Sequence, residues 1–377
     1  MEVTSFEEMN LKDTLLRGIF SYGYEKPSVI QQKAIMPILT GKDIIVQSQS
    51  GTGKTATFAI SALQTVEPEL HCAQILIMSP TRELAMQSNS VIKVLGDYID
   101  DLNTYVCIGG VKTNINELKS AQIIVGTPGR IYDVISNGLL KTDNLKMFVL
   151  DEADEMLSGG FMEQVQEIFK IIEAETFQKV IVSATLSREI LEITEHFMDN
   201  PIKILVKKDD LTLEGIKQYY VNVSKEQWKI DTLIDLYDNI SVAQTIMFIN
   251  SKKKLEWVYD TLKAKEYPVT MIHGELEQND RNDILKNFKN GNIKMLLSTD
   301  LFARGIDVQQ VSLVINYDIP SNVENYIHRI GRSGRFGRKG VSINFVTDDD
   351  IKLQKTIEQF YNTQIDELPT NISDIII

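Results

Sequence analysis

An apolar run at residues 148–150 ends on Asp-Glu-Ala-Asp, which places three carboxylates within four residues, at Asp151, Glu152 and Asp154. Carboxylates held this close repel one another unless a cation or a network of hydrogen bonds compensates their charge. A buried strand that delivers acids to a sheet edge would suit Mg²⁺, because hard cations prefer oxygen ligands. The alternative is a solvated loop without chemistry, and the segment alone leaves both possibilities open.

A glycine-rich loop follows another apolar run at residues 43–46 and reads Ser-Gln-Ser-Gly-Thr-Gly-Lys-Thr over residues 48–55. Glycines let successive backbone N–H groups face one anion, and the N-terminus of a following helix adds partial positive charge. Lys54 supplies a full charge and Thr55 a hydroxyl for Mg²⁺. A glycine turn with a chance Lys-Thr would fit the same residues. The residues expected to bind phosphate are Ser50, Gly51, Thr52, Gly53, Lys54 and Thr55.

The loop and the acids together predict a metal-dependent site for phosphoryl hydrolysis. Thr55 would hold the magnesium ion, and Asp151 would reach it through a water molecule. Glu152 would orient the attacking water and remove its proton. The loop therefore gives the three acids both a cation and a chemical role.

The composition is that of a globular protein, with 377 residues, 43% hydrophobic and 24% charged side chains. This length allows two domains with ordinary cores. No run approaches the roughly 18 apolar residues of a membrane span, and the acidic start does not resemble a secretory signal. We therefore expect a soluble intracellular protein. The net charge of −13 argues against nucleic-acid binding by the whole surface, so any such binding must use local groups.

A basic run without an acid lies in the second half of the chain, where it comprises Arg329, Arg332, Arg335, Arg338 and Lys339. A capping box formed by Ser321 and Glu324 predicts a helix that carries His328 near its end. Two guanidiniums three residues apart, as in Arg332 and Arg335, can converge on one phosphate. The alternative is a scattered solvated face, which would not require that spacing.

Short β-branched runs alternate with helical periods, such as 82–95, and this alternation predicts an α/β protein with parallel sheets covered on both faces. The predicted strands are 43–48, 75–80, 105–109, 123–126, 148–151, 180–183 and 203–206, then 218–223, 245–250, 269–273, 294–299, 313–317 and 341–346. We expect domains at 1–207 and 216–377, joined by a polar linker at 208–215. Most unusual clusters follow a strand, so we expect ligands at the carboxyl ends, in a cleft between the two sheets.

The phosphate loop, DEAD, SAT (183–185), ARGID (303–307) and HRIGRSGR (328–335) occur in this order, and with them the chain resembles the DEAD-box RNA helicases over essentially its whole length. The resemblance implies two RecA-like domains, ATP and Mg²⁺ as cofactors, and RNA-stimulated ATP hydrolysis coupled to local unwinding of RNA. The catalytic residues it implies are Glu152, Asp151, Lys54, Arg332, Arg335, Ser183, Thr185, Asp154 and His328.

The same resemblance assigns further contacts with the nucleotide. It implies that Gln31 reads the adenine edge, that Phe6 stacks on the ring, and that Asp307 accepts from the ribose while Gly305 allows close approach.

The two arginines would act as arginine fingers from the domain opposite Lys54, so hydrolysis would require a closed cleft. Ser183 and Thr185 would bind Asp154 and transmit the nucleotide state, although both could simply cap a strand end.

Matching segments also imply RNA contacts. They offer small residues, hydroxyls, backbone N–H groups and isolated arginines, which hold a sugar-phosphate backbone without reading base edges. Each segment alone would more often be a helix cap or a turn, and Lys252 to Lys254 could extend the groove or simply begin a solvated helix. The predicted RNA-binding residues are Pro80, Arg82, Gly110, Thr127, Arg130, Asn250, Ser251, Gly274, Arg281 and Thr299.

Within this family the chain is most similar to the translation initiation factor 4A group, through long stretches such as 204–218, 304–320 and 325–341. This similarity implies a monomeric helicase acting on mRNA in the cytoplasm with a HEAT-repeat scaffold as partner. A nuclear paralogue that clamps RNA in an exon-junction complex or processes ribosomal RNA is the alternative. A phosphate-loop ATPase that remodels proteins is a more distant one, and its ATPase activity would not respond to RNA.

Overall fold

The structure is a computed structural model that describes residues 3–48, 51–157, 159–205, 216–239, 244–300, 311–333 and 340–369. Internal contacts divide the chain into two compact units, Met1–Val206 and Lys207–Ile377. The predicted linker 208–215 lies outside the described residues. Among the residues that the structure describes, no helix combines the length and the apolar character needed to cross a membrane.

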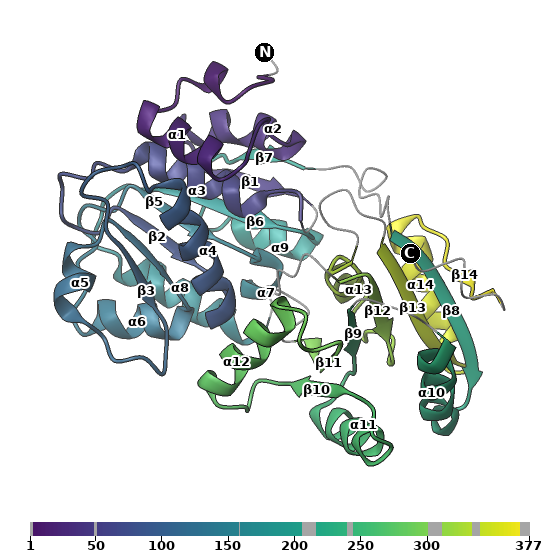
Figure 1. Ribbon diagram of the computed structural model, residues 1–377. Helices are drawn as coiled ribbons and strands as arrows, with labels where there is room; N and C mark the ends of the chain where they lie inside the picture. Colours follow the sequence, from purple (N-terminus) through teal and green to yellow (C-terminus); the bar gives the residue numbers. More distant parts are fainter. Residues whose placement is uncertain are drawn as a thin grey trace. The chain divides into compact units, whose positions relative to one another are not determined.

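The first unit is a parallel sheet with strand order β3-β4-β2-β5-β6-β1-β7, covered by helices (Figure 1). Its strands are β1 (Ile44–Gln47), β2 (Ile75–Met78), β3 (Thr104–Cys107), β4 (Ile123–Gly126), β5 (Met147–Leu150), β6 (Gln178–Ser183) and β7 (Ile202–Ile204). Its helices are α1 (Asp13–Ser21), α2 (Val29–Ile38), α3 (Lys54–Thr65), α4 (Arg82–Leu95), α5 (Ile115–Ser120), α6 (Pro128–Ser136), α7 (Ala153–Met156), α8 (Met162–Ile171) and α9 (Arg188–Thr194), with 3-10 turns η1 (Glu7–Met9) and η2 (Gly159–Phe161).

Both faces of this sheet are buried, which explains why its strands read as continuous apolar runs. Successive side chains of a strand point to opposite faces. Ile44 and Val46 pack with α1 to α4 in one core, whereas Ile45 packs with α5 to α9 in the other.

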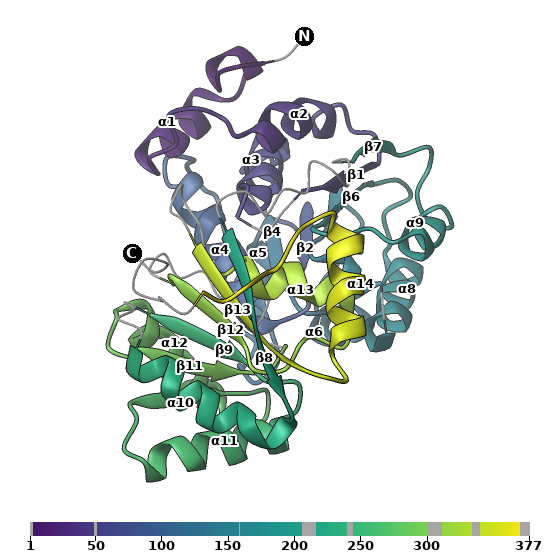
Figure 2. The same cartoon turned by 90° about the vertical axis from the view of Figure 1, so that its right-hand side faces the viewer.

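The second unit repeats this architecture with strand order β10-β11-β9-β12-β13-β8-β14, again parallel (Figure 2). Its strands are β8 (Ile216–Ser224), β9 (Thr245–Phe248), β10 (Val269–Ile272), β11 (Met295–Ser298), β12 (Leu313–Asn316), β13 (Gly340–Thr347) and β14 (Asp366–Glu367). Its helices are η4 (Glu226–Trp228), α10 (Lys229–Asn239), α11 (Lys252–Ala264), α12 (Gln278–Lys289), α13 (Val323–Ile330) and α14 (Ile351–Tyr361). Helices α10 and α11 cover one face, and α12, α13 and α14 the other.

The predicted α/β fold class is confirmed, and each predicted strand coincides with an observed one. The sequence missed β14, because two exposed acidic residues at a sheet edge carry no apolar signal. The predicted start of α13 is corrected by one residue. Asn322, rather than Ser321, caps this helix by accepting a hydrogen bond from the Glu324 N–H at 2.9 Å.

Candidate functional site

The strand order of the first unit gathers three of the predicted clusters. The phosphate loop follows β1, the acids follow β5, and Ser183 ends β6. These strands are neighbours in the order β5-β6-β1. Because the carboxyl ends of parallel strands meet at one edge of a sheet, Lys54, Asp151 and Thr185 belong to a single site.

The phosphate loop has the backbone conformation that its glycines allow. Gly51 and Gly53 have φ values of 81° and 101°, a region that L side chains rarely adopt. The loop runs into α3, whose first residue is Lys54. The Lys54 side chain is buried, and its ammonium nitrogen has no hydrogen-bond partner among the described residues. Ser50 lies outside the described residues.

The two acids after β5 are almost completely buried, with 3% of Asp151 and 5% of Glu152 exposed. Burial first, and the charge of Glu152 second, raise the pKa of the Asp151 carboxyl from 3.8 to about 7, although Lys54 opposes this shift. The Asp151 carboxylate also accepts a hydrogen bond from the Glu152 N–H at 3.0 Å. Glu152 itself has a φ of 48°. Strained non-glycine backbone of this kind is typical of functional sites.

The contact predicted between the acids and the SAT segment is present in the structure. The Thr185 hydroxyl donates to Asp154 Oδ2 at 2.7 Å, and the Asp154 N–H donates to Ser183 Oγ at 3.3 Å. The Ser183 hydroxyl in turn donates to the Thr185 carbonyl at 2.6 Å. Since these residues are buried, the bonds tie the third acid rigidly to the end of β6.

Gln31 lies against the phosphate loop. It is the third residue of α2 in a capping box, where its Oε1 accepts from the Ser28 N–H at 2.7 Å. A Cβ added at Gly53 would lie 2.8 Å from Gln31 Nε2, so glycine is required there by close approach as well as by φ. The Gln31 amide is therefore placed beside the loop, and its predicted reading of adenine stays a prediction.

Phe6 does not have the surroundings expected of a residue that stacks on a nucleotide. Its side chain is completely buried and belongs to the same hydrophobic core as Met9 and Leu15. No face of the ring is exposed, so this structure does not support the predicted stacking. The sequence could not distinguish an aromatic residue of the hydrophobic core from one that stacks on a nucleotide.

The residues present fit a magnesium-bound triphosphate. The loop offers a buried ammonium group without a hydrogen-bond partner among the described residues. The adjacent carboxyl has a raised pKa, which a bound cation would lower again. Thr55 follows Lys54 in the first turn of α3. Lys54 could thus hold phosphate oxygens, while Thr55 and Asp151 could hold the metal.

The raised pKa of Asp151 predicts how stability depends on pH without nucleotide and magnesium. The folded state binds this proton more tightly than the unfolded state, so the stabilisation is complete below about pH 4 and is lost as pH rises through about 7. Asp151→Asn cannot titrate. We expect the melting temperature of this variant minus that of the wild type to increase between pH 5 and 8, measured by calorimetry in EDTA. A difference that does not vary with pH would contradict the prediction.

A second group of predicted residues occupies the other half of the same sheet edge. Pro80 and Arg82 follow β2, Gly110 follows β3, and Thr127 follows β4. These strands are neighbours in the order β3-β4-β2. The nucleotide residues and the predicted RNA residues of this unit therefore lie on separate halves of one edge.

Arg82 crosses the two glycines after β3. A Cβ added at Gly109 or Gly110 would lie 3.1 or 2.9 Å from its guanidinium nitrogens. Arg130 donates to both Asp133 and Thr113. The structure thus brings Arg82 and Gly110 together. The Arg130 guanidinium instead forms hydrogen bonds to side chains within the same unit.

The predicted RNA residues of the second unit also follow adjacent strands, β10-β11-β9. Gly274 comes after β10, Thr299 after β11, and Asn250 after β9. Asn250 Oδ1 accepts from Arg329 at 2.6 Å and its Nδ2 donates to the Ile319 carbonyl at 2.8 Å. The side-chain amide of this exposed residue therefore forms hydrogen bonds within the protein, a structural role that the sequence did not indicate.

Two other predicted RNA residues also have structural contacts. Ser251 caps α11 by accepting from the Lys254 N–H at 3.3 Å, which is the helix-cap alternative left open by the sequence. Arg281 is buried and donates to Gln278 within α12. Lys252 pairs with Glu275, so that part of the basic segment is locally neutralised.

The two described arginines of the basic run are both buried and differ in their hydrogen-bond partners. Arg329 is fully buried, and its Nε donates to Asp300 at 2.5 Å, so it is not part of a solvated face. Arg332 is 3% exposed and its Nε donates to the His328 carbonyl at 3.1 Å. Arg335 lies outside the described residues, as do Gly305 and Asp307.

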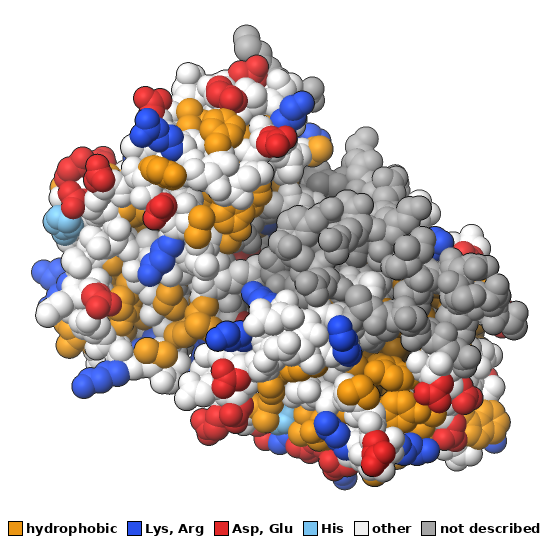
Figure 3. Space-filling view, in the orientation of Figure 1, with side chains coloured by type: hydrophobic (Ala, Val, Ile, Leu, Met, Phe, Trp, Pro, Cys, Tyr) orange, Lys and Arg blue, Asp and Glu red, His pale blue; other side chains and the backbone are white. Residues whose placement is uncertain are grey.

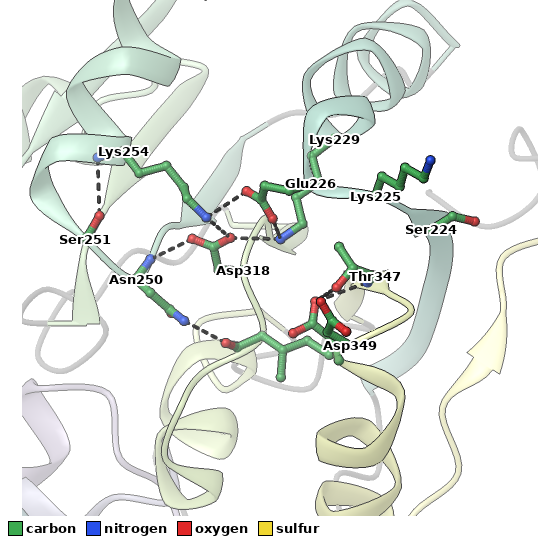
Figure 4. Close-up of a pocket in the computed structure, with 12 residues that line it drawn as sticks. Ser224, Lys225, Glu226, Lys229, Asn250, Ser251, Lys254, Asp318, Thr347 and Asp349 are labelled. Atoms are coloured by element: carbon green, nitrogen blue, oxygen red, sulfur yellow. Dashed lines mark hydrogen bonds and ion pairs between the residues drawn. The ribbon is translucent and has the colours of Figure 1, made fainter.

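Sequence reasoning missed a polar cavity in the second unit, with a volume of about 470 Å³, where β8, β9, β12 and β13 end (Figure 4). Asp318 Oδ1 accepts from Lys229 at 2.9 Å and from Lys254 at 2.8 Å. Burial alone would raise the pKa of Asp318, but these two lysines and the Asn250 N–H hold it below its ordinary value. The signal in the sequence was an acid directly after an apolar strand.

The described side chains on the face drawn in Figure 3 show basic and acidic groups interspersed, without one continuous basic area. This distribution agrees with the net charge of −13. RNA contacts on this face would therefore depend on individual groups at strand ends.

Two protein families, curated relatives and solved structures are similar to this chain. Residues 28–193 match the DEAD/DEAH box helicase family and residues 228–337 the helicase conserved C-terminal domain. The ATP-dependent RNA helicase eIF4A of Neurospora crassa is 56% identical, covering 99% of this chain and 94% of that protein. The eIF4A of Aspergillus clavatus is 55% identical, covering 100% and 95%.

Solved structures with a similar fold include RNA-bound proteins. S. cerevisiae Dbp5 bound to RNA and ADP BeF3 has a TM-score of 0.93 at 34% identity and covers 99% of this chain and 97% of its own. Mss116p bound to ssRNA and AMP-PNP has a TM-score of 0.88 at 27% identity, covering 98% and 80%. The nuclear and protein-remodelling alternatives are not favoured by the curated relatives. The chain belongs to the DEAD-box family of ATP-dependent RNA helicases and is a member of the eIF4A type.

Proposed function

We propose that the edge formed by β1, β6 and β5 hydrolyses ATP with Mg²⁺. The observation that carries this proposal is the buried Lys54 ammonium group, which has no hydrogen-bond partner among the described residues. Lys54 and the N–H groups of Gly51, Thr52 and Gly53 would hold the phosphates. Thr55 would hold the metal directly and Asp151 through water, while Glu152 takes the proton of the attacking water.

We propose that the remaining nucleotide contacts come from both parts of the chain. Gln31 would read the adenine edge through its Nε2, the polar group nearest the loop. Gly305 and Asp307 would meet the ribose, while Arg332 and Arg335 would stabilise charge on the γ-phosphate. His328 would support that arginine segment. On this proposal, 1–207 and 216–377 act as the two helicase domains, and 208–215 joins them.

We propose that RNA binds at two places. One is the part of the first sheet's edge formed by β3, β4 and β2, and the other is the part of the second sheet's edge formed by β10, β11 and β9. The contacts would reach sugars and phosphates, so that binding does not depend on sequence. Unrelated single-stranded RNAs of equal length should then stimulate ATP hydrolysis to the same degree. A strong preference for one sequence, or the absence of any stimulation, would contradict this proposal.

Arg82→Ala should weaken the binding of all RNA sequences to the same degree, because the protein would lose a contact with a phosphate and no contact with a base. We expect the slope of log K against log salt to decrease in magnitude by about 0.7, the contribution of one phosphate in a single strand. Fluorescence anisotropy with labelled RNA in ATP and Mg²⁺ at several salt concentrations measures this slope. Lys93→Ala, on the last turn of the same helix, is the matched control. An unchanged slope would exclude Arg82 from the RNA contacts.

We further propose that the substrate is mRNA, that the protein works in the cytoplasm as a monomer, and that a HEAT-repeat scaffold recruits it. The support is the resemblance to the translation initiation factor 4A group, which agrees with curated relatives named ATP-dependent RNA helicase eIF4A. Duplex unwinding and ATP-dependent RNA retention should be compared with and without the HEAT-repeat domain of the initiation-factor scaffold. Stimulated unwinding would support this function, whereas retention with suppressed turnover would indicate an RNA clamp. Cell fractionation tests the compartment.

A further inference from the structure

Helix α13 packs on its sheet through buried polar groups. This helix carries His328 and ends just before Arg332. Tyr326 and Arg329 are both completely buried. They are three residues apart and therefore share one face of the helix. Each makes hydrogen bonds to side chains of the strands beneath it. The apolar pattern of these strands did not predict polar residues in this core.

The centre of this arrangement is a pair of asparagines on neighbouring strands. Asn316 of β12 and Asn344 of β13 are partners in the sheet register, and both are completely buried. Asn316 Nδ2 donates to Asn344 Oδ1 at 2.8 Å. Asn344 Nδ2 donates to the Tyr219 carbonyl at 2.8 Å. The pair thus joins three adjacent strands through side chains as well as through the backbone ladder.

The asparagine pair binds the helix at two points. Asn344 Nδ2 also lies 3.3 Å from Tyr326 Oη, which donates in turn to Gln218 Oε1 at 2.9 Å. On the other side, Asn316 Oδ1 accepts from Arg329 Nη1 at 3.3 Å. We call these five side chains, Asn316, Asn344, Tyr326, Arg329 and Gln218, the polar seat.

Arg329 extends the polar seat to the sheet edge. Its guanidinium binds both Asp300 oxygens, at 2.5 and 2.9 Å, and Asn250 Oδ1 at 2.6 Å. It also donates to the Asp318 carbonyl at 2.7 Å. These partners follow β11, β9 and β12, and two of those ends carry predicted RNA residues. One chain of hydrogen bonds therefore connects the proposed RNA edge with the helix before the proposed arginine finger.

The stability of the domain does not explain the polar seat. Replacing a fully satisfied buried polar network by well-packed apolar side chains of similar volume is often neutral for stability. None of the five side chains contains a buried polar atom without a hydrogen-bond partner, so this network is fully satisfied. Hydrogen bonds are directional, whereas apolar contacts allow a short helix to shift or rotate. What the seat provides is one defined position for α13.

We propose that Asn316 and Asn344 are positioning residues for RNA-stimulated ATP hydrolysis, because they hold α13, and with it Arg332, in a fixed position relative to the strand ends that carry Asn250 and Thr299. This inference rests on the proposed function of Arg332. It assigns a functional role to two residues that would touch neither ATP nor RNA.

The double variant N316L/N344L tests this role in the full-length protein, since leucine has the branching and the number of side-chain heavy atoms of asparagine and both amides of the pair are removed together. Tyr326 Oη keeps its hydrogen bond to Gln218, and Arg329 Nη1 keeps its bond to the Asp318 carbonyl. We expect a melting temperature within a few degrees of the wild type and an unchanged Kd for a fluorescent ATP analogue. RNA-stimulated kcat should fall about 10- to 100-fold, the cost of a misplacement of roughly 1 Å. A double variant that is folded and retains full RNA-stimulated kcat would overturn the proposal.

Thr245→Val is the matched control, because Thr245 is equally buried in the same sheet and its hydroxyl has no hydrogen-bond partner among the described residues. This variant should keep both stability and RNA stimulation. Should the double variant not fold, Tyr326→Phe decides the question, because it removes only the hydroxyl that joins Asn344 to Gln218. A several-fold loss of RNA-stimulated kcat at constant ATP affinity is then expected, and no loss would overturn the proposal.

The same assay separates this inference from the proposed function. If Arg332→Ala hydrolyses ATP normally, the role proposed for Arg332 is wrong, and the inference fails with it. If Arg332→Ala is inactive while N316L/N344L is normal, only the positioning role is wrong.

Discussion

Glu152→Gln should reduce RNA-stimulated ATP hydrolysis by about 10²- to 10⁴-fold, the usual contribution of a general base. Glutamine has the shape of glutamate but cannot accept the proton of the attacking water. It also removes the negative charge that helps to raise the pKa of Asp151, so metal binding should not be impaired. The variant should therefore still bind ATP and RNA and should retain RNA while ATP is present.

Single-turnover hydrolysis and filter binding of labelled RNA measure the two effects separately. Glu163→Gln provides the same chemical change at an exposed position in the first turn of α8. The control should hydrolyse ATP and release RNA like the wild type. Undiminished hydrolysis by Glu152→Gln would exclude this residue as the base.

Arg332→Ala should reduce kcat by about 10³- to 10⁵-fold, because an arginine finger stabilises charge that develops on the γ-phosphate in the transition state. ATP affinity should change little, since the phosphate loop and Lys54 would supply ground-state binding. Arg332→Lys should also be severely impaired, because an ammonium group lacks the planar, forked geometry of the guanidinium. Arg335→Ala is expected to behave like Arg332→Ala.

Steady-state kinetics with saturating RNA distinguishes these expectations, because kcat should fall while KM for ATP stays nearly constant. Arg332 is buried, so the melting temperature of each variant must be compared with that of the wild type. Arg188→Ala removes a guanidinium that is 94% exposed and serves as the surface control. A folded Arg332→Ala variant that retains hydrolysis within a few-fold would contradict the role of an arginine finger.

The strands and the phosphate loop could be predicted because their determinants are local. Buried parallel strands are apolar on both faces, so β1 and β5 read as short continuous runs. The loop requires positive φ angles at two positions, and the glycines at 51 and 53 indicate these angles because glycine adopts them readily. These features depend on residues that are neighbours in the chain.

Individual side-chain roles were less predictable, because burial depends on residues distant in sequence. Phe6 occupies the core, and Arg329 is buried against Asp300, although both sequence contexts were compatible with exposure. Asn250 has the residue type of an RNA ligand, but its amide forms hydrogen bonds to Arg329 and to the Ile319 carbonyl. Residue type gives the available hydrogen bonds, and only the packing decides which partners take them.

The sequence by itself determined the fold class, the phosphate loop and the acids, and hence the family to which the chain belongs. Only the tertiary structure decided the order of the strands. That order places the residues predicted to bind the nucleotide after β5, β6 and β1. It places the residues predicted to bind RNA after β3, β4 and β2. It also pairs Asn316 with Asn344 under α13. The physical reason is that strand order and buried polar pairing arise from contacts between distant segments, which leave no periodic signal in either segment alone.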